Sequence, residues 1–400
     1  MDERRESPGQ ADGAGRHREG EALPAPPRPP RGEELGGGGF AAEGQYFLKY
    51  DHSSYQQFRS WAPAVLFWAA VLCSIRFPAA AAAERSGEES APPRVRVVIA
   101  PTLSYGPLWI ALEEGFFRDE GLDVELLTMR RTAEALPSLA AGEVEVLGSH
   151  ILPSHMNVIA RGGRVRIVAD KGHHDPDGCT SEAIVAAPSV IASGRLDDPA
   201  RFEGLRVATD KGMSGYFYID TLLATLGVSA EVLRTFDLPL SSKEAGFTNG
   251  AIDFSTAAEP WLTRLVRSGT AVKWKAVEDF VPGFQSGVIL YGPALLDEDQ
   301  GTGTRFLAGY LRGIRRYNEG KTDRNVEIIA EATELDPELV REACWISMRD
   351  DGEIDVESLV GYQRWALREG LIDRAVAPEE FWDPSFVRGA NEILRSREAR

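Results

Sequence analysis

Several side chains able to bind a small molecule come soon after apolar runs of this 400-residue chain. Tyr105 and Gly106 follow one such run, and Ser149 and His150 follow another. A hydroxyl and an imidazole exchange hydrogen bonds with a polar ligand, and an aromatic ring can stack on it. The alternatives are a loop anchor for Tyr105 and an internally hydrogen-bonded strand end for His150. We predict a ligand-binding surface here and assign no catalytic residue.

The segment "KGMSG" opens an apolar helix in the second half of the chain and is a candidate anion site. The first backbone N–H groups of a helix are unpaired and lie at the positive end of its dipole. The Ser214 hydroxyl adds a donor, although the same residue could simply cap the helix. We therefore include Gly212, Met213 and Ser214 among the expected ligand contacts.

Glu259 and Trp261 follow the short strand "AIDFSTA" and are the remaining candidates. Glu259 could accept a hydrogen bond from a ligand amine, and Trp261 could stack on a ring. In the structural alternative, Glu259 is a helix-start charge favoured by the dipole and Trp261 belongs to the core. The residue types leave both interpretations open.

Motifs of the common catalytic and cofactor sites are missing from the sequence. It contains no G-x-S-x-G, no G-x-x-x-x-G-K-[ST], no H-E-x-x-H and no C-x-x-C. The loop "KGHHDPDGCT" carries imidazole, carboxylate and thiol groups, all of which bind zinc. A turn built by Asp-Pro and Asp-Gly explains the same residues. We expect no metal and no cofactor.

Strands and helices alternate where these candidates lie. Residues 94–149 read as strand, helix, strand, helix and strand, a spacing typical of βαβ units and a parallel sheet. Ligands of such sheets bind beyond the carboxyl ends of the strands. The candidates in this part of the chain should therefore lie along one edge.

The order of elements is repeated. Gly115 and Gly227 each end a helix; Gly142 and Gly250 each precede a short strand, in "GEVEVLGS" and "GAIDFSTA". This predicts two related α/β lobes joined by strands near 182–188 and 287–290. We expect the chain to have five parts. Residues 1–58 are a disordered tail or follow a start assigned too far upstream, and residues 59–83 are a signal peptide. Residues 94–185 form lobe 1, residues 190–282 form lobe 2, and residues 286–400 return to lobe 1 and form the C-terminal helices.

The N-terminal region predicts export. A basic residue, Arg59, precedes an apolar run from Trp61 to Ile75, and small residues follow up to Ala83. This is the pattern of a signal peptide, and the run is short for a membrane span. We expect cleavage between Ala80 and Ser86 and a periplasmic or extracytoplasmic mature protein.

Charge and cysteine content narrow the functional classes. The formal net charge is -17, which disfavours nucleic-acid binding because phosphate contacts need clustered Lys and Arg. Only Cys179 and Cys344 follow the expected cleavage site. A bridge or two buried thiols would both fit, and the long separation favours thiols.

An ordered series of segments carries a family resemblance. "YGPLWIALEEGFFRDEGLDVELL", "LAAGEVEVLGS", "FEGLRVATDKG", "LLATLGVSAEVLR" and "TNGAIDFSTAAEPW" occur in that order. The series resembles the solute-binding proteins of nitrate, sulfonate and taurine importers, a family that includes thiamine-precursor binders. The resemblance implies a two-lobed periplasmic binding protein of type II that closes about a hinge. It also implies a small-molecule solute, and a permease and ATPase of an ABC transporter as partners. We expect a monomer.

Two other functional classes remain open at this stage. One is an enzyme on the same scaffold, either a decarboxylase using His150 and Glu259 as acid and base or a relative of the thiamine-precursor synthases. The cysteine-rich motif of those synthases is not found in this sequence. The other is a ligand sensor of a membrane receptor. Turnover would indicate the enzyme, and reversible binding would indicate transport or sensing.

Overall fold

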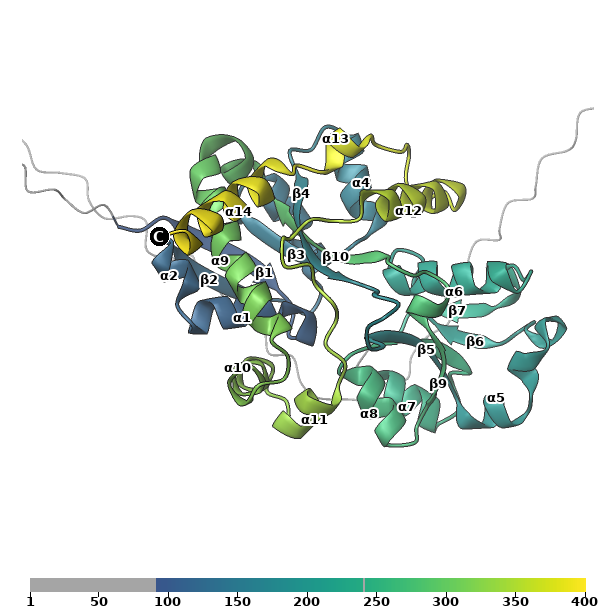
Figure 1. Ribbon diagram of the computed structural model, residues 1–400. Coiled ribbons are helices and arrows are strands. Elements are labelled where there is room, and N and C mark those ends of the chain that lie inside the picture. The colour runs from purple at the N-terminus through teal and green to yellow at the C-terminus, as the bar shows by residue number, and fades with distance from the viewer. Residues whose placement is uncertain (1–90, 240–241) are drawn as a thin grey trace, which may run out of the picture. The chain divides into compact units, whose positions relative to one another are not determined.

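A computed structural model describes residues 91–239 and 242–400 (Figure 1). The expected tail, signal peptide and cleavage site lie outside these residues. Within them, no helix is long and apolar enough to cross a membrane. The fold is α/β, with two separate sheets and a set of C-terminal helices.

The first sheet has five strands in the order β2-β1-β3-β10-β4. Their bounds are Arg94–Ile99 (β1), Asp123–Thr128 (β2), Val146–His150 (β3), Arg166–His173 (β4) and Gln285–Tyr291 (β10). β1 pairs in parallel with β2 and β3, whereas β10 runs antiparallel to both of its neighbours. Every residue of β10 is buried, as expected for a strand covered on both faces.

The second sheet repeats this plan in the order β7-β6-β8-β5-β9. Its strands are Glu182–Ala186 (β5), Arg206–Ala208 (β6), Arg234–Phe236 (β7), Phe254–Ala258 (β8) and Val272–Ala276 (β9). β5 pairs only with β8 and β9, so it belongs to the second lobe. The boundary expected at residue 185 thus falls inside β5, and the chain leaves lobe 1 between His173 and Glu182.

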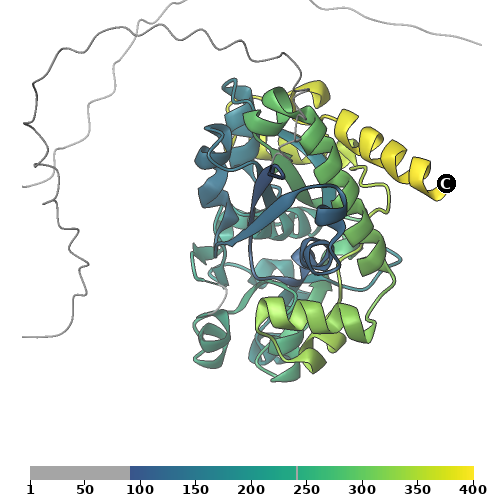
Figure 2. The same cartoon turned by 90° about the vertical axis from the view of Figure 1, so that its left-hand side faces the viewer.

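Helices cover both sheets and continue to the C-terminus. Lobe 1 contains α1 (Gly106–Glu113), α2 (Phe116–Asp119), α3 (Leu136–Ala140) and α4 (Pro153–Ala160), and lobe 2 contains α5 (Pro188–Ala192), α6 (Ser214–Thr225), α7 (Lys243–Thr248) and α8 (Trp261–Arg267). The C-terminal set is α9 (Gln300–Asn318), α10 (Asp323–Thr333), α11 (Pro337–Glu342), α12 (Val356–Arg368), α13 (Pro378–Phe381) and α14 (Ser385–Glu398). α9 packs against α1 and α14 beside the first sheet (Figure 2). Its first turn is capped by Asp299, whose carboxylate accepts from the Thr302 N–H at 2.9 Å.

Four glycines stand at equivalent places in the two lobes and share one backbone conformation. Gly115 and Gly227 have φ of 75° and 71°, and Gly142 and Gly250 have φ of 76° and 70°. This left-handed region is open to glycine without steric cost. Each pair ends the same helix of its lobe, which is why the spacing of these residues revealed the repeat.

A similar arginine–carboxylate clamp holds an arginine of β1 in lobe 1 and an arginine of β6 in lobe 2. The Arg96 N–H and guanidinium donate to Glu145 at 2.7 and 2.6 Å. The Arg206 N–H and guanidinium donate to Asp253 at the same distances. Each carboxylate therefore satisfies a backbone donor and pairs with a charge at once.

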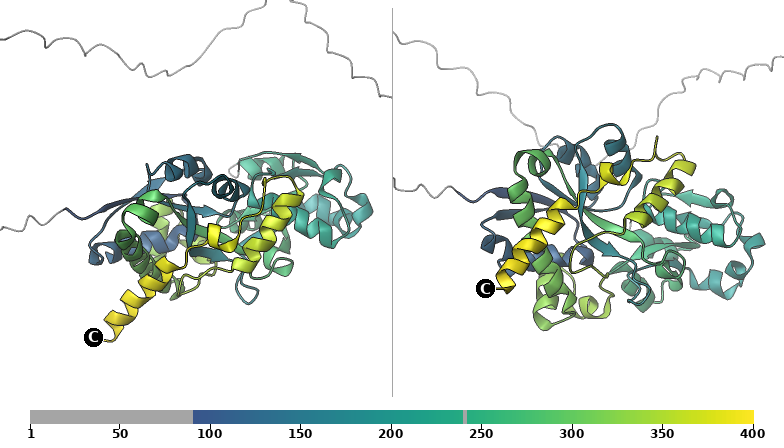
Figure 3. Two further views of the ribbon diagram at one scale, coloured as in Figure 1. Left: turned by 90° about the horizontal axis from the view of Figure 1, so that it is seen from above. Right: turned by 45° about the horizontal axis from the view of Figure 1, so that its top comes forward.

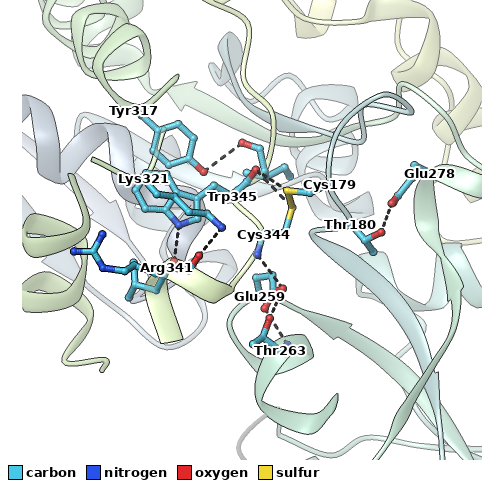
Figure 4. Close-up of a disulfide and its surroundings, with 12 residues drawn as sticks. Cys179, Thr180, Glu259, Thr263, Glu278, Tyr317, Lys321, Arg341, Cys344 and Trp345 are labelled. Carbon is cyan, nitrogen blue, oxygen red and sulfur yellow. Dashed lines mark hydrogen bonds between the residues drawn. A yellow bond between two sulfur atoms is a disulfide. The ribbon is translucent and has the colours of Figure 1, made fainter. Parts of the chain in front are cut away.

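Three chain segments connect the lobes. Two are the crossings at 174–181 and 277–284, tied together where the Thr180 hydroxyl donates to Glu278 at 2.5 Å. The third follows α11, where Cys344 is joined to Cys179 by a disulfide (Figure 4). The expectation of two buried thiols is wrong. Cysteines 165 residues apart are brought to a Cα distance of 5.7 Å, which the sequence does not reveal.

The helix α12 also bridges the lobes, lying beside α6 (Figures 1 and 3). The Trp365 indole N–H donates to Asp220 of α6 at 2.8 Å. Phe217 of α6 packs edge-on against Tyr362 and Trp365 of α12, with ring centroids 5.1 and 5.0 Å apart. The C-terminal helices thus pack on lobe 1 and also across to lobe 2.

Candidate functional site between the lobes

The ligand-side edges of the two sheets meet in a polar cluster. His150 ends β3 in lobe 1, and Glu182 begins β5 beside the carboxyl end of β8 in lobe 2. His150 Nδ1 lies 3.8 Å from Glu182 Oε1. His174 Nε2, on the first crossing, lies 3.2 Å from Glu182 Oε2 and 3.1 Å from the Tyr218 hydroxyl. Glu182 is therefore at the point where lobe 1, lobe 2 and a crossing come together.

A buried lysine adds positive charge to the lobe 1 side. Lys171 is 1% exposed, and its Nζ donates to the Ser104 hydroxyl at 3.0 Å. The ammonium also lies 4.1 Å from the centroid of the Tyr105 ring, a cation–π contact. Among the described residues it has no carboxylate within 4.0 Å.

Lys171 was absent from the residues expected in the site because the sequence places it in a loop. The apolar run ends at Ala169, so we expected the strand to end there and 171–180 to be irregular. β4 instead continues to His173, since β10 pairs with it along its whole length. A glycine-lysine pair at a strand end is too weak a signal to have located this residue.

A second buried lysine lies in lobe 2. Lys243 begins α7, is 8% exposed, and donates from Nζ to the Thr256 carbonyl of β8 at 2.9 Å. Like Lys171, it has no carboxylate within 4.0 Å among the described residues. Each lobe therefore places one ammonium group behind its ligand-side edge.

Burial and neighbouring charges set the protonation of these groups. Burial acts to raise the pKa of Glu182, but the close approach of His174, together with His150 and Tyr218, outweighs this effect and lowers the pKa to about 2. Burial lowers the pKa of His150 to about 4, although the negative charge of Glu182 acts to raise it. It also lowers the pKa of Lys171 to about 7 and that of Lys243 to about 8, and Glu182 opposes both shifts. At neutral pH the cluster thus contains one carboxylate, neutral His150 and two lysines near their titration range.

The candidate ligand-binding residues of lobe 1 differ in their burial and in their distance from the polar cluster. Ser149 is 1% exposed, and its Oγ has no hydrogen-bond partner among the described residues. Tyr105 is buried, donating to the Gly148 carbonyl at 2.8 Å, and contacts the site only through Lys171. Gly106 lies outside the site, because an added Cβ would meet Tyr317 at 2.8 Å in the packing against α9.

The turn before α6 is open to solvent in part. Met213 is 39% exposed and occupies the N-cap of α6, so the helix has no side-chain cap and Ser214 does not cap it. The Gly212 N–H donates to Asp210 at 2.8 Å. Ser214 is the first residue of α6, in the turn that follows β6, and its contact with a ligand stays a prediction.

Glu259 serves the protein itself. Its carboxylate accepts from the Thr263 N–H at 3.0 Å, the Thr263 hydroxyl at 2.8 Å and the Cys344 N–H at 3.1 Å (Figure 4). It therefore caps α8 and holds the third connecting segment. Trp261 is half-buried, with the Arg264 guanidinium 5.1 Å from its ring centroid. The Glu259 carboxylate is thus occupied by contacts within the protein, as in the structural alternative, and the ligand contact expected for Trp261 stays a prediction.

The other places where a site could lie are the candidate zinc loop and two surface hollows. Cys179 of the candidate zinc loop is in the disulfide, and no group of three metal-binding side chains is present in residues 91–239 and 242–400. Two surface hollows of about 390 and 330 Å³ lie elsewhere, one between α10 and α11 and one beside Gly227. The polar cluster between the lobes is therefore the candidate site.

A family model described as NMT1/THI5 like matches residues 103–319. The chain belongs to that family. The matched segment contains Lys171, Glu182 and Lys243 and so spans the whole polar cluster. No curated protein sequence matches the chain.

Solved structures of the same fold include binding proteins and an enzyme. The periplasmic nitrate-binding protein NrtA from Synechocystis PCC 6803 has a TM-score of 0.62 and 15% identity, covering 75% of this chain and 89% of its own. The alkanesulfonate-binding protein SsuA from Xanthomonas axonopodis pv. citri, bound to MOPS, has a TM-score of 0.58 and 17% identity, covering 73% and 99%. The desulfurization enzyme DSZB has a TM-score of 0.57 and 12% identity, covering 76% and 100%. The family member has the periplasmic binding protein fold expected from its sequence.

Proposed function

We propose that this family member is the extracytoplasmic solute-binding component of an ABC importer. It captures a small polar solute between its lobes and presents it to a permease coupled to an ATPase. The observation that carries the proposal is the polar cluster, in which groups from both lobes face one another at the carboxyl ends of strands. The names of NrtA and SsuA as nitrate- and alkanesulfonate-binding proteins support the solute class.

Burial of the cluster supports a hinge mechanism. Lys171 and Ser149 are each 1% exposed, so a solute reaches them only when the lobes separate. A solute that contacts both lobes favours the closed state, because only that state offers all of its contacts. Opening would occur at the crossings, while the disulfide keeps the first crossing attached to the third segment.

The disulfide also supports export of the protein. Such bonds persist in oxidising compartments and are rare in the cytosol. This agrees with the signal peptide expected at 59–83 and with a periplasmic or extracytoplasmic location. We propose that the mature protein works as a monomer that contacts the permease.

An enzyme on this scaffold has less support from the site. The decarboxylase alternative paired His150 with Glu259, but Glu259 accepts three hydrogen bonds from Thr263 and Cys344. The carboxylate beside His150 is Glu182. No acid–base pair of the expected kind is therefore formed.

A thermal-shift screen of the full chain tests the proposal. Sulfonates, nitrate, carboxylates, amines, amino acids, pyrimidines and aromatic acids are each added to the protein, and a bound solute raises its Tm. We expect at least one class to raise Tm, to bind reversibly in calorimetry and to reduce the radius of gyration in X-ray scattering. Consumption of the solute, or no binding across the classes, would contradict solute capture.

A further inference from the structure

The Lys171 residue lies beside two glycines of the neighbouring strands, Gly148 and Gly287. A Cβ added at Gly148 would lie 2.6 Å from Tyr105 Cε1 and 3.3 Å from Lys171 Cδ. A Cβ added at Gly287 would lie 2.9 Å from the Lys171 carbonyl oxygen and 3.4 Å from its Cε. The two glycines thus leave room for the Tyr105 ring and for the Lys171 backbone, and the Lys171 side chain passes beside both. Burying an ammonium is unfavourable, so an arrangement that accommodates it points to a use for the charge.

The Lys171 ammonium retains hydrogen-bonding capacity. It has three N–H donors, and the described residues supply one hydrogen-bond acceptor, the Ser104 hydroxyl. The Tyr105 ring lies against another side of it. On β3, the buried Ser149 hydroxyl also has no partner among the described residues. Lobe 1 therefore offers the Lys171 ammonium to an acidic group.

Glu182 offers the opposite charge from lobe 2. It is 8% exposed, and its Oε2 forms no hydrogen bond of good geometry among the described residues, although His174 lies 3.2 Å away. An ionised carboxylate has about four acceptor positions, so capacity remains for a donor of a ligand. Lys243 is the other charge in this lobe, but its ammonium donates to the Thr256 carbonyl.

We propose that Lys171 and Glu182 act as a pair of opposite charges that selects a solute carrying both an acidic group and a protonated amine. The inference rests on the proposed solute-binding function. The acidic group binds Lys171 in lobe 1, and the amine binds Glu182 in lobe 2. Such a solute spans the lobes and stabilises their closed arrangement, whereas a simple anion meets repulsion from Glu182.

Two matched sets of probes test the charge pair on the full chain. The first is ethanesulfonate, 2-aminoethanesulfonate and ethylamine; the second is benzenesulfonate, 4-(aminomethyl)benzenesulfonate and benzylamine. Binding is measured by calorimetry and by the rise in Tm. In the wild-type protein, the aminosulfonate of at least one set should bind about tenfold or more tightly than its matched sulfonate or amine, as expected for an added charge-assisted hydrogen bond.

Variants of Lys171 and Glu182, with one control, test the role of each charge. Lys171→Met should weaken aminosulfonate binding by at least about tenfold, while Lys275→Met, on the exposed side of β9, should leave it unchanged. Glu182→Gln should weaken the aminosulfonate but not the matched sulfonate, so the preference between them narrows or reverses. Lys171→Gln, which keeps polar contacts without charge, replaces Lys171→Met if that variant does not fold.

The outcomes separate this inference from the proposed function. Unchanged aminosulfonate binding in a folded Lys171 variant, or a wild-type preference for the plain sulfonate or amine, overturns the charge pair. Binding of a neutral solute in the broader screen, with none of the six probes bound, also overturns it but leaves solute capture in place. Failure of every solute in both experiments contradicts the capture function as well.

Discussion

The two lobes follow one structural plan but differ where a solute would bind. Both have five strands in an equivalent order, left-handed glycines at the same helix ends and the same arginine–carboxylate clamp. At the edges that face each other, lobe 1 has Lys171 above two strand glycines, whereas lobe 2 has Glu182 and Lys243. The parts that recur thus stabilise each lobe, and the parts that do not recur provide the polar cluster.

The close contact between strand and helix also changes sides between the lobes. In lobe 1 the glycine is Gly148 on β3, and the bulky partner is Tyr105 ahead of α1. In lobe 2 the glycine is Gly215 on α6, and the larger partner is Thr256 on β8. The small residue is therefore on the strand in lobe 1 and on the helix in lobe 2. The following predictions test this comparison, beginning with the largest effect.

The disulfide joins two of the connecting segments and is not part of the plan that the lobes share. Its removal should have the largest effect on stability. Replacing both Cys179 and Cys344 by Ser should lower the free energy of unfolding by about 3–5 kcal/mol, because the bond closes a loop of 165 residues. Denaturant unfolding measures this. Wild-type protein treated with a dithiol should match the double variant, and equal stability with and without the bond would contradict its stabilising role.

The clamps should be equally important to the two lobes. Glu145→Ala and Asp253→Ala each remove a carboxylate that binds a backbone N–H and a guanidinium, which should cost about 2 kcal/mol in each case. Glu125→Ala is the control, since its pair with Arg94 is at the surface and should contribute under about 1 kcal/mol. Stability is again measured by denaturant unfolding. A large loss of stability for one of the two variants and none for the other would show that the two clamps are not equivalent.

The exchanged glycines should both resist a larger side chain. Gly148→Ala and Gly215→Ala place a Cβ 2.6 Å from Tyr105 and 2.5 Å from Thr256, so each should lower stability by about 1–2 kcal/mol. Gly361→Ala in α12 is the matched control because its Cβ meets nothing within 4 Å. That change should raise stability by up to about 1 kcal/mol through helix propensity. The Tm of each of the three variants is measured by thermal unfolding. An unchanged Tm for Gly148→Ala or Gly215→Ala would contradict the close packing at that glycine.

The two buried lysines should give ligand-free stability a rising dependence on pH. Burial lowers the pKa of Lys171 to about 7 and that of Lys243 to about 8, from ordinary values of 10.5. Between each lowered pKa and 10.5 the unfolded chain binds more protons than the folded one, so stability rises with pH by at most about 1.4 kcal/mol per pH unit for each lysine. Below pH 7 the unfavourable burial is present in full.

Measuring the free energy of unfolding at pH 7 and pH 8 distinguishes the contribution of Lys171 from that of Lys243. Lys171→Met should flatten the rise in this interval more than Lys243→Met, because the lobe 1 lysine titrates first. An unchanged slope in both variants would show that other groups produce it.

The repeated features were visible in the sequence because they depend on local rules. The helix-ending Gly115 and Gly227 need a left-handed backbone, and helices were expected in the C-terminal part of the chain, where α9 to α14 lie. β10 was recognisable as the strand returning to the first sheet for the same reason. Much of the fold could therefore be predicted.

The site was less accessible because its contacts are distant in the sequence. Glu259 accepts from the Cys344 N–H, 85 residues away, so its structural use cannot be read from its neighbours. Lys171 follows an apolar run and resembles the start of a loop, although it continues β4 beside β10. Glu182 was expected only as the first residue of a strand. Side chains that meet through tertiary pairing leave no local pattern.

The disulfide makes one covalent ring of the segment from Cys179 to Cys344. Every strand of lobe 2 and the second crossing lie inside this ring. A protease that cuts any single peptide bond within it leaves two fragments joined through sulfur, which separate on a gel only after reduction. A nicked molecule therefore keeps its two lobes covalently linked until the bond is reduced.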